Sequence, residues 1–229
     1  MLVKPAYELL VFDLDGTLID STQDLAQSVN AARADAGLPA LPTAAVASYV
    51  GDGAEMLIRR ALGPGASDAQ VARGLAYFLQ YYREHMLDHT VLYAGVREAL
   101  AAWHAAGLAM AVLTNKPERF SRDLVAGLGL GEVFARVYGG NSFRTKKPDP
   151  HGLRRIMREL GSSPARTLMI GDSSVDVLTA RNAGTDCVGV RYGLRPEDFD
   201  RHPPDILVDD MRELAAVVGA GERSAPVPT

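Results

Sequence analysis

Short apolar runs alternate with helix-like stretches along most of this 229-residue chain. The runs are apolar throughout, without the in-out alternation of a half-exposed strand, and this pattern predicts a parallel sheet covered by helices on both faces. The expected strands are Leu9–Phe12, Leu108–Leu113, Val133–Tyr138, Thr167–Ile170, Cys187–Val190 and Ile206–Val208. The expected helices are Val96–Ala106, Glu118–Leu128, Pro150–Leu160, Val175–Ala183 and Met211–Val218. The predicted fold class is therefore α/β.

One segment breaks the alternation, because residues 20–89 contain only helix-like stretches separated by loops rich in Pro and Gly. We expect residues 1–19 and 90–219 to form a Rossmann-like α/β core and residues 20–89 to form an inserted helical cap. Residues 220–229 are expected to be a disordered tail. Hinges for cap movement are expected near Thr17–Ser21 and Leu87–Tyr93.

Composition narrows the partners and the compartment. The net charge of -4 gives no basic surface for nucleic acid or for an anionic membrane. No apolar run approaches the roughly 20 residues of a membrane-spanning helix. The single cysteine, Cys187, has no internal disulfide partner, which favours a reducing compartment. We therefore expect a cytoplasmic monomer or homodimer that acts on a small molecule.

Polar residues follow four of the expected elements, where a parallel sheet binds its ligands. Asp13 and Asp15 end the first strand; two residues apart in extended chain, they should share a side and lie close together. The other sites hold Thr114 with Asn115, Lys147, and Asp172 with Asp176. Taken singly, the aspartate sites and the Thr114 site also fit turns or helix caps, and Lys147 also fits a solvated surface lysine. The chain has only four lysines against 20 arginines, yet it keeps lysine in two of these loops.

Together the four sites predict phosphoryl transfer. Converging carboxylates repel one another unless a cation lies among them, and hard oxygen ligands suit magnesium. Lys147, Thr114 and the backbone N–H groups of Leu14 and Asp15 would then hold a phosphate. One carboxylate would attack phosphorus, and the other would act as the acid and base. The spacing alone leaves open which aspartate does which.

The motifs "DLDGTL", "TN", "KP" and "GDSSVD", in this order, resemble those of the haloacid dehalogenase-like hydrolase superfamily. The resemblance covers nearly the whole chain. It implies that Asp13 is the nucleophile and Asp15 the general acid and base. It further implies that Thr114, Asn115 and Lys147 bind the phosphoryl group, with Lys147 also catalytic. The implied Mg²⁺ ligands are Asp13, Asp15 through its carbonyl, and Asp172, with Asp176 supporting Lys147 or the metal's waters.

The cap stretch "SYVGDGAEMLIRRAL" is similar to the glycine-bearing specificity loop of the phosphoglycolate phosphatase branch. Gly51, Asp52 and Gly53 would then contact the substrate, and Arg60 rather than Arg59 would face the site. Two positions depart from the branch: Asn141 replaces an expected aspartate, and Arg191 replaces a smaller residue.

Several other activities were weighed against these motifs. Asp15 argues against dehalogenation, and residues 20–89 contain no lysine for Schiff-base cleavage of a phosphonate. "DGT" rather than "DGV" favours a phosphatase over a phosphosugar mutase by resemblance. The expected function is Mg²⁺-dependent hydrolysis of a small phosphorylated metabolite, best matched by 2-phosphoglycolate. Other small esters such as a sugar phosphate or a nucleoside monophosphate, pyrophosphate, and a non-catalytic phospho-receiver or metal-binding module remain as alternatives.

Overall fold

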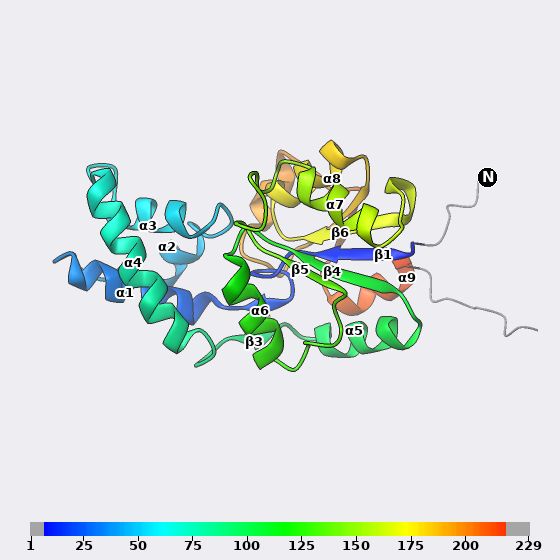
Figure 1. Cartoon of the computed structure of the whole chain (residues 1–229), viewed down its shortest axis with the longest axis horizontal. Helices are drawn as coiled ribbons and strands as arrows, with labels where there is room; N and C mark the ends of the chain where they lie inside the picture. The colour runs from blue at the N-terminus through cyan, green and yellow to red at the C-terminus, as the bar shows by residue number, and fades with distance from the viewer. Residues whose placement is uncertain (1–6, 219–229) are drawn as a thin grey trace, which may run out of the picture.

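The computed structural model describes residues 7–218 and has a six-stranded parallel sheet at its centre (Figure 1). The central strand β1 pairs with β4 on one side and β6 on the other, so that Leu9 lies opposite both Ala109 and Thr167. The strands, in sheet order, are β5 (Arg136–Tyr138), β4 (Ala109–Leu113), β1 (Leu9–Phe12), β6 (Thr167–Gly171), β7 (Asp186–Val190) and β8 (Ile206–Val208). The predicted α/β fold is thus confirmed.

Every side chain of β1 is buried. Because alternate side chains of a strand point to opposite faces of the sheet, both faces must be covered, and helices cover them. Leu10 and Phe12 pack with helices of one face, and Leu9 and Val11 pack with helices of the other. Figure 1 shows α7 and α8 on one side of the sheet and α5 and α9 on the opposite side. The helices are α5 (Val96–Ala105), α6 (Glu118–Gly127), α7 (His151–Glu159), α8 (Ser174–Ala183) and α9 (Leu214–Val218).

Four helices form a lobe at one end of the molecule (Figure 1). They are α1 (Thr22–Asp35), α2 (Thr43–Ala47), α3 (Ala54–Leu62) and α4 (Asp68–His85). The helix α4 begins with a capping box, in which Ser67 and Gln70 bind each other's backbone N–H groups. The apolar side chains of the lobe join the core of one face of the sheet in a single cluster, in which the rings of Phe78 and Tyr82 stack with centroids 5.5 Å apart.

The chain enters and leaves the lobe through a two-stranded antiparallel ribbon. Its strands are β2 (Ile19–Asp20) and β3 (Val91–Leu92). Beside the ribbon, the buried carboxylate of Asp24 accepts hydrogen bonds from the backbone N–H groups of His89 and Thr90 and from the Thr90 hydroxyl, at 2.8–3.1 Å. The two connections to the lobe, distant in sequence, are thereby tied to each other.

Most predicted element bounds agree with the structure to within one residue, and two differ by more. The strand expected from Val133 begins only at Arg136, because Val133 closes a turn onto Leu130 and Phe134 packs edge-on against the ring of Phe12. The helix expected over 211–218 begins as a 3-10 turn, Met211–Glu213, before α9. Two further 3-10 turns are Pro164–Arg166 and Pro196–Asp200. The expected tail, 220–229, lies outside the described residues.

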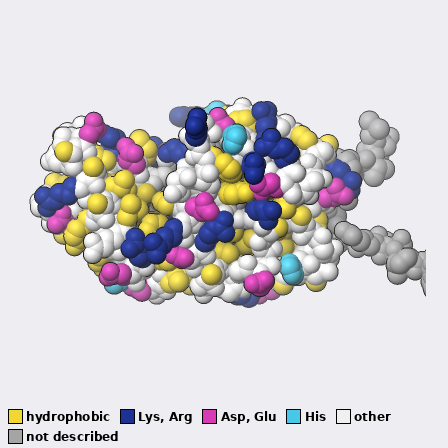
Figure 2. All heavy atoms as spheres, viewed as in Figure 1, with side chains coloured by type: hydrophobic (Ala, Val, Ile, Leu, Met, Phe, Trp, Pro, Cys, Tyr) yellow, Lys and Arg dark blue, Asp and Glu magenta, His cyan; other side chains and the backbone are white. Residues whose placement is uncertain are grey.

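Within residues 7–218, no helix is both long and apolar enough to cross a bilayer. Figure 2 shows basic and acidic side chains interspersed over the visible face, where they form no continuous basic surface.

Candidate active site

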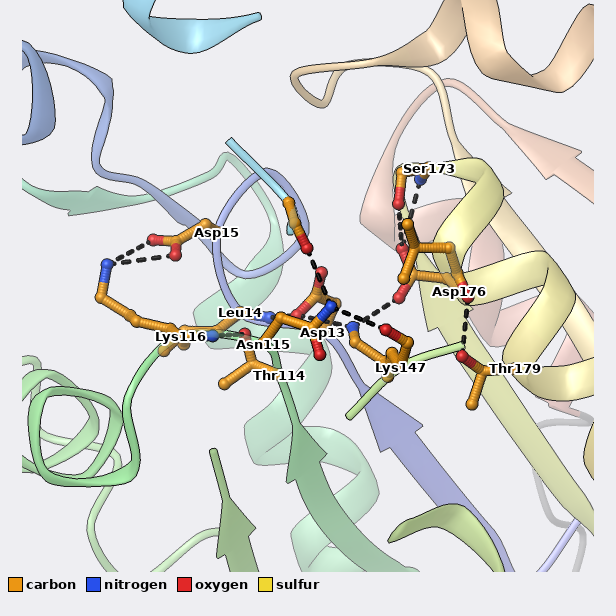
Figure 3. Close-up of polar contacts among 12 residues, drawn as sticks. Asp13, Leu14, Asp15, Thr114, Asn115, Lys116, Lys147, Ser173, Asp176 and Thr179 are labelled. Atoms are coloured by element: carbon orange, nitrogen blue, oxygen red, sulfur yellow. Dashed lines mark hydrogen bonds and ion pairs between the residues drawn. The ribbon is translucent and has the colours of Figure 1, made fainter. Parts of the chain in front are cut away.

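Four loops meet where the parallel strands end, and they carry most of the residues singled out in the sequence. Asp13 follows β1, Thr114 and Asn115 follow β4, and Asp172 follows β6. Lys147 comes from the loop between β5 and α7. All five side chains are buried, and Figure 3 shows Asp13, Thr114, Asn115 and Lys147 gathered around one point.

Lys147 is held between two carboxylates. Its ammonium lies 2.9 Å from Asp13 Oδ1 and 2.6 Å from Asp176 Oδ1. Burial acts to lower the pKa of Lys147, but the charges of Asp13 and Asp176 outweigh burial and raise that pKa above its ordinary value. The ammonium therefore stays charged at neutral pH, beside the carboxylate predicted to be the nucleophile.

Asp176 lies at the start of α8, where it has two structural partners. Its Oδ2 atom accepts hydrogen bonds from the Ser173 hydroxyl, at 2.8 Å, and from the Ser173 backbone N–H, at 3.2 Å, which caps the helix. Its Oδ1 atom pairs with Lys147. Both oxygens are thus committed to positioning neighbours.

Three buried carboxylates form a cluster that fits a divalent cation. One oxygen from each of Asp13, Asp172 and Asp176 lies within 4.8 Å of the others. Burial raises the pKa of Asp13 to about 6, with Asp176 adding to the rise and Lys147 opposing it. Burial and the charges of Asp176 and Asp13 likewise raise the pKa of Asp172 well above its ordinary range. Uncompensated charge of this kind, on hard oxygen donors, is what a magnesium ion would neutralise.

The chain turns sharply directly after Asp13, and Asp13 and Asp15 nevertheless line one cavity. β1 ends at Phe12, Gly16 adopts φ +81°, and the N–H groups of Thr17 and Leu18 bind Leu14 O. The side-chain alternation of a strand therefore does not extend to Asp15. The backbone N–H of Leu14, which was predicted to bind phosphate, donates a hydrogen bond to Asp13 Oδ1 at 2.8 Å in this structure.

Asp15 pairs with a second buried lysine that was not predicted as a site residue. The ammonium of Lys116 lies 2.9 Å from Asp15 Oδ1 and 3.1 Å from Oδ2, and the Ser21 hydroxyl donates to Oδ1 at 2.5 Å (Figure 3 shows the lysine contacts). The side chain of Lys116 is only 4% exposed. The sequence did contain a signal for this residue. Lysine is scarce in the chain, and Lys116 lies in one of the two candidate site loops that contain lysine.

The residues after β4 join loops to each other. Asn115 Nδ2 donates to the carbonyl of Gly51 at 2.9 Å and to that of Lys147 at 3.0 Å. Thr114 Oγ1 accepts from the backbone N–H of Lys116 at 3.3 Å. Thr114 and Asn115 both line the cavity, and Asn115 Oδ1 is buried without a hydrogen-bond partner among the described residues.

The glycine-bearing loop of the lobe lies against the core. Gly51 and Gly53 line the cavity with φ values of +120° and +93°, which side chains other than that of glycine rarely adopt. Lys146 Nζ donates to the carbonyl of Asp52 at 2.5 Å. Arg195, from the loop after β7, donates to the carbonyl of Val50 at 3.3 Å. Together with the Asn115 contact, these bonds hold the lobe closed over the core.

The two adjacent arginines of α3 have different roles. Arg60 donates hydrogen bonds to the Asp52 carboxylate at 2.5 Å and to the carbonyl of Tyr49 at 3.0 Å. These bonds hold the glycine-bearing loop in place. Arg59 pairs with Glu55 and Asp68 on the surface. Neither arginine lines the cavity.

The enclosed cavity is small, about 40 Å³, and has two kinds of wall. The acidic residues Asp13, Asp15 and Asp172 lie at its core side. Apolar and aromatic residues of both parts of the molecule line another side, namely Leu25, Val50, Leu57, Phe78, Tyr82, Pro117 and Phe120, and polar residues including Thr114, Asn115, Lys116 and Arg195 complete the lining. A space of this volume can hold a few water molecules or a small polar group.

Comparison with known proteins adds a family to this geometry. The family model for haloacid dehalogenase-like hydrolases matches residues 10–190. The chain is 42% identical to a phosphoglycolate phosphatase of Pseudomonas putida over 215 residues, 90% of this chain and 78% of that protein. It is 40% identical to one of Vibrio vulnificus, over 92% of this chain and 96% of that protein. The crystal structure of a predicted phosphoglycolate phosphatase from Haemophilus somnus superposes with a TM-score of 0.88 at 30% identity, covering 95% of this chain and 99% of that one.

Proposed function

The chain belongs to the haloacid dehalogenase-like hydrolases and is a phosphatase, and on this basis we propose that it hydrolyses 2-phosphoglycolate to glycolate and phosphate. The substrate is the one named in the relatives from Pseudomonas putida and Vibrio vulnificus, which align over most of their length. The small cavity beside Asp13 supports a leaving group of a few atoms. The contact between Lys147 and Asp13 carries the chemical part of the proposal.

We assign the steps of the reaction to residues whose positions suit them. Asp13 attacks phosphorus and forms an aspartyl phosphate, which divides one difficult hydrolysis into two easier steps. Lys147 neutralises charge on the transferring oxygens, and Thr114 and Asn115 complete the phosphate-binding loop. Asp15 protonates the leaving oxygen and later takes a proton from water. Asp176 keeps Lys147 in place through their 2.6 Å contact.

Magnesium is the proposed cofactor, held by Asp13, Asp172 and the carbonyl of Asp15. When bound, the ion would offset the charge of the acidic cluster and polarise the phosphoryl group. The donor set supports this choice, because the buried acidic cluster offers carboxylate oxygens and no soft ligand.

We further propose that residues 20–89 act as a cap that opens to admit substrate about the ribbon of β2 and β3. Gly51, Asp52 and Gly53 would bring the cap to the substrate, with Arg60 holding their loop. We also propose that the protein is a monomer or homodimer in the cytoplasm. Its partner would be a small metabolite and not nucleic acid or a membrane.

The test is phosphate release from a panel containing 2-phosphoglycolate, a sugar phosphate, a nucleoside monophosphate and pyrophosphate. We expect turnover that requires Mg²⁺, is abolished by a chelator and is highest with 2-phosphoglycolate. Asp13→Asn keeps the side-chain shape and should lower kcat by about 10³-fold or more. An Asp13→Asn protein as active as the wild type would exclude the proposed mechanism. A higher kcat/KM for another ester would show that 2-phosphoglycolate is not the preferred substrate.

A further inference from the structure

The cationic residues that line the cavity are Lys116 and Arg195, whereas Lys147 lies behind Asp13 and is not part of the lining. In Figure 3 the two lysines reach the site from different sides, Lys147 to Asp13 and Lys116 to Asp15. Lys147 is shared by two carboxylates, Asp13 and Asp176. Lys116 pairs with one carboxylate, that of Asp15, and an ammonium has three donor hydrogens. It can therefore bind a further acceptor without giving up Asp15.

A hydroxyl from the lobe lies at the Lys116 end of the cavity. Tyr82, on α4, lines the cavity, and the Lys116 ammonium lies 4.6 Å from the centre of its ring. The Tyr82 residue is 1% exposed, and its hydroxyl lies within reach of the Lys116 ammonium but makes no well-formed hydrogen bond among the described residues. A buried polar group without a well-formed hydrogen bond is unusual enough in a folded protein to require an explanation.

The surroundings of this hydroxyl keep it in one place. The Tyr82 ring stacks on Phe78 at 5.5 Å and meets Phe120 edge-on at 5.4 Å. Phe78 and Phe120 also line the cavity. Such apolar walls strengthen the interaction of a cation with an anion and provide nothing to bind a neutral polar group.

We propose that Lys116 and Tyr82 together bind a carboxylate on the leaving group, so that the enzyme selects phosphate esters carrying a second anionic group. This inference rests on the proposed phosphatase function and assigns its specificity to two residues. The carboxylate would accept from the Lys116 ammonium and from the Tyr82 hydroxyl. Because Lys116 belongs to the core and Tyr82 to the lobe, the substrate would join the two parts and favour closure.

The experiment compares two esters of similar size, 2-phosphoglycolate and ethyl phosphate, which differ in the leaving-group carboxylate. For the wild type we expect kcat/KM to be at least about 100-fold higher with 2-phosphoglycolate. Failure to hydrolyse either ester would contradict the proposed function itself. Equal hydrolysis of both would leave the phosphatase intact and overturn only the present inference.

Tyr82→Phe is the sharpest variant, because it removes one oxygen that makes no well-formed hydrogen bond, and it should change the thermal midpoint little. We expect the ratio of the two kcat/KM values to fall about tenfold, mainly through a higher KM for 2-phosphoglycolate, and inhibition by glycolate to weaken similarly. Tyr81→Phe is the matched control, since Tyr81 stacks on His85 outside the cavity. An unchanged ratio in Tyr82→Phe would remove Tyr82 from the site.

Lys116→Met and Lys116→Gln test the cation. Both also disturb Asp15, so each will slow both esters; the decisive quantity is the ratio, which should fall about 100-fold. Arg119→Met is the control for long-range charge, because it removes an exposed cation three residues away. If the two Lys116 variants lose activity equally on both esters and still bind glycolate like the wild type, Lys116 only positions Asp15 and the proposal is wrong. Lys116→Gln, which can still hydrogen-bond Asp15, keeps the test decisive if Lys116→Met does not fold.

Discussion

The ammonium of Lys147 lies 2.9 Å from Asp13 Oδ1, and this buried pair joins a loop after β1 to a loop between β5 and α7. The lysine holds the carboxylate in a single orientation and lowers the cost of its charge. It does not remove that cost, because burial still raises the pKa of Asp13 to about 6. Burial and mutual repulsion therefore destabilise the ionised form of the acidic cluster, and a bound cation would reduce this repulsion.

A first prediction concerns the pH dependence of stability without metal. The pKa of Asp13 is higher in the folded protein, about 6, than its ordinary value of 3.8. Its stabilising contribution is therefore complete below about pH 3.8 and is lost as the pH rises through about 6. Relative to Asp13→Asn, the metal-free wild type should lose roughly 2–3 kcal/mol of unfolding free energy between pH 4.5 and 8.

Urea unfolding in a chelator, across this pH range, measures the difference. Added Mg²⁺ should abolish it at pH 8, because the cation then stabilises the ionised carboxylate. Asp123→Asn, at an exposed site beside Arg119, is the control and should show no such trend. A gap between wild type and Asp13→Asn that is constant with pH would contradict the prediction.

A second prediction concerns the turn after Asp13. Gly16 has φ +81°, and a Cβ atom there would collide with the carboxyl group of Asp172. Gly16→Ala should therefore cost more than the roughly 1–2 kcal/mol of left-handed backbone and should also lower phosphatase activity. Gly37→Ala is a matched control, because Gly37 has φ +72° with nothing within 4 Å of its Cβ position. Equal losses of stability and activity in the two variants would refute a specific role for Gly16.

A third prediction concerns the connection between core and lobe. Asp24 is fully buried and accepts bonds from His89 and Thr90. Burial alone would raise the pKa of Asp24, but these hydrogen bonds outweigh burial and lower it. The contribution of the ionised Asp24 to the free energy of unfolding is therefore present above about pH 4 and is lost as the pH falls through the lowered pKa. Asp24→Asn should cost about 1–3 kcal/mol at pH 7, because an amide cannot accept all these bonds. Chemical unfolding measures this; a change below 0.5 kcal/mol, roughly that of an ordinary surface substitution, would be contrary to expectation.

A fourth prediction concerns closure of the lobe. Arg195 reaches the carbonyl of Val50 and lies 3.8 Å from the Asp52 carboxylate. Arg195→Ala should raise KM several-fold more than it lowers kcat, since closure contributes binding energy. Small-angle scattering should show a larger radius of gyration, which a phosphate analogue only partly reverses. Arg191→Ala, which removes an exposed arginine paired with Asp209, should match the wild type in both measurements.

Much of the fold could be predicted because each element carries its own local pattern. β1 and β6 are apolar at every position, and residues that follow parallel strands must meet at one edge of the sheet. This rule placed Asp13, Thr114 and Asp172 in one neighbourhood. Strand alternation, by contrast, does not describe Asp15, which lies in the turn after β1, although Asp15 and Asp13 line the same cavity.

The sequence by itself determined the alternation of strands and helices, the inserted lobe and the chemical types gathered at the strand ends. Only the tertiary structure decided which charges pair. Lys116 and Asp15 are 101 residues apart, and Tyr82 reaches the same cavity from a different lobe. Local periodicity carries no information about such contacts, because they depend on how the lobe docks on the core. The surroundings of Asp13 follow from strand order, whereas those of Lys116 and Tyr82 follow from docking.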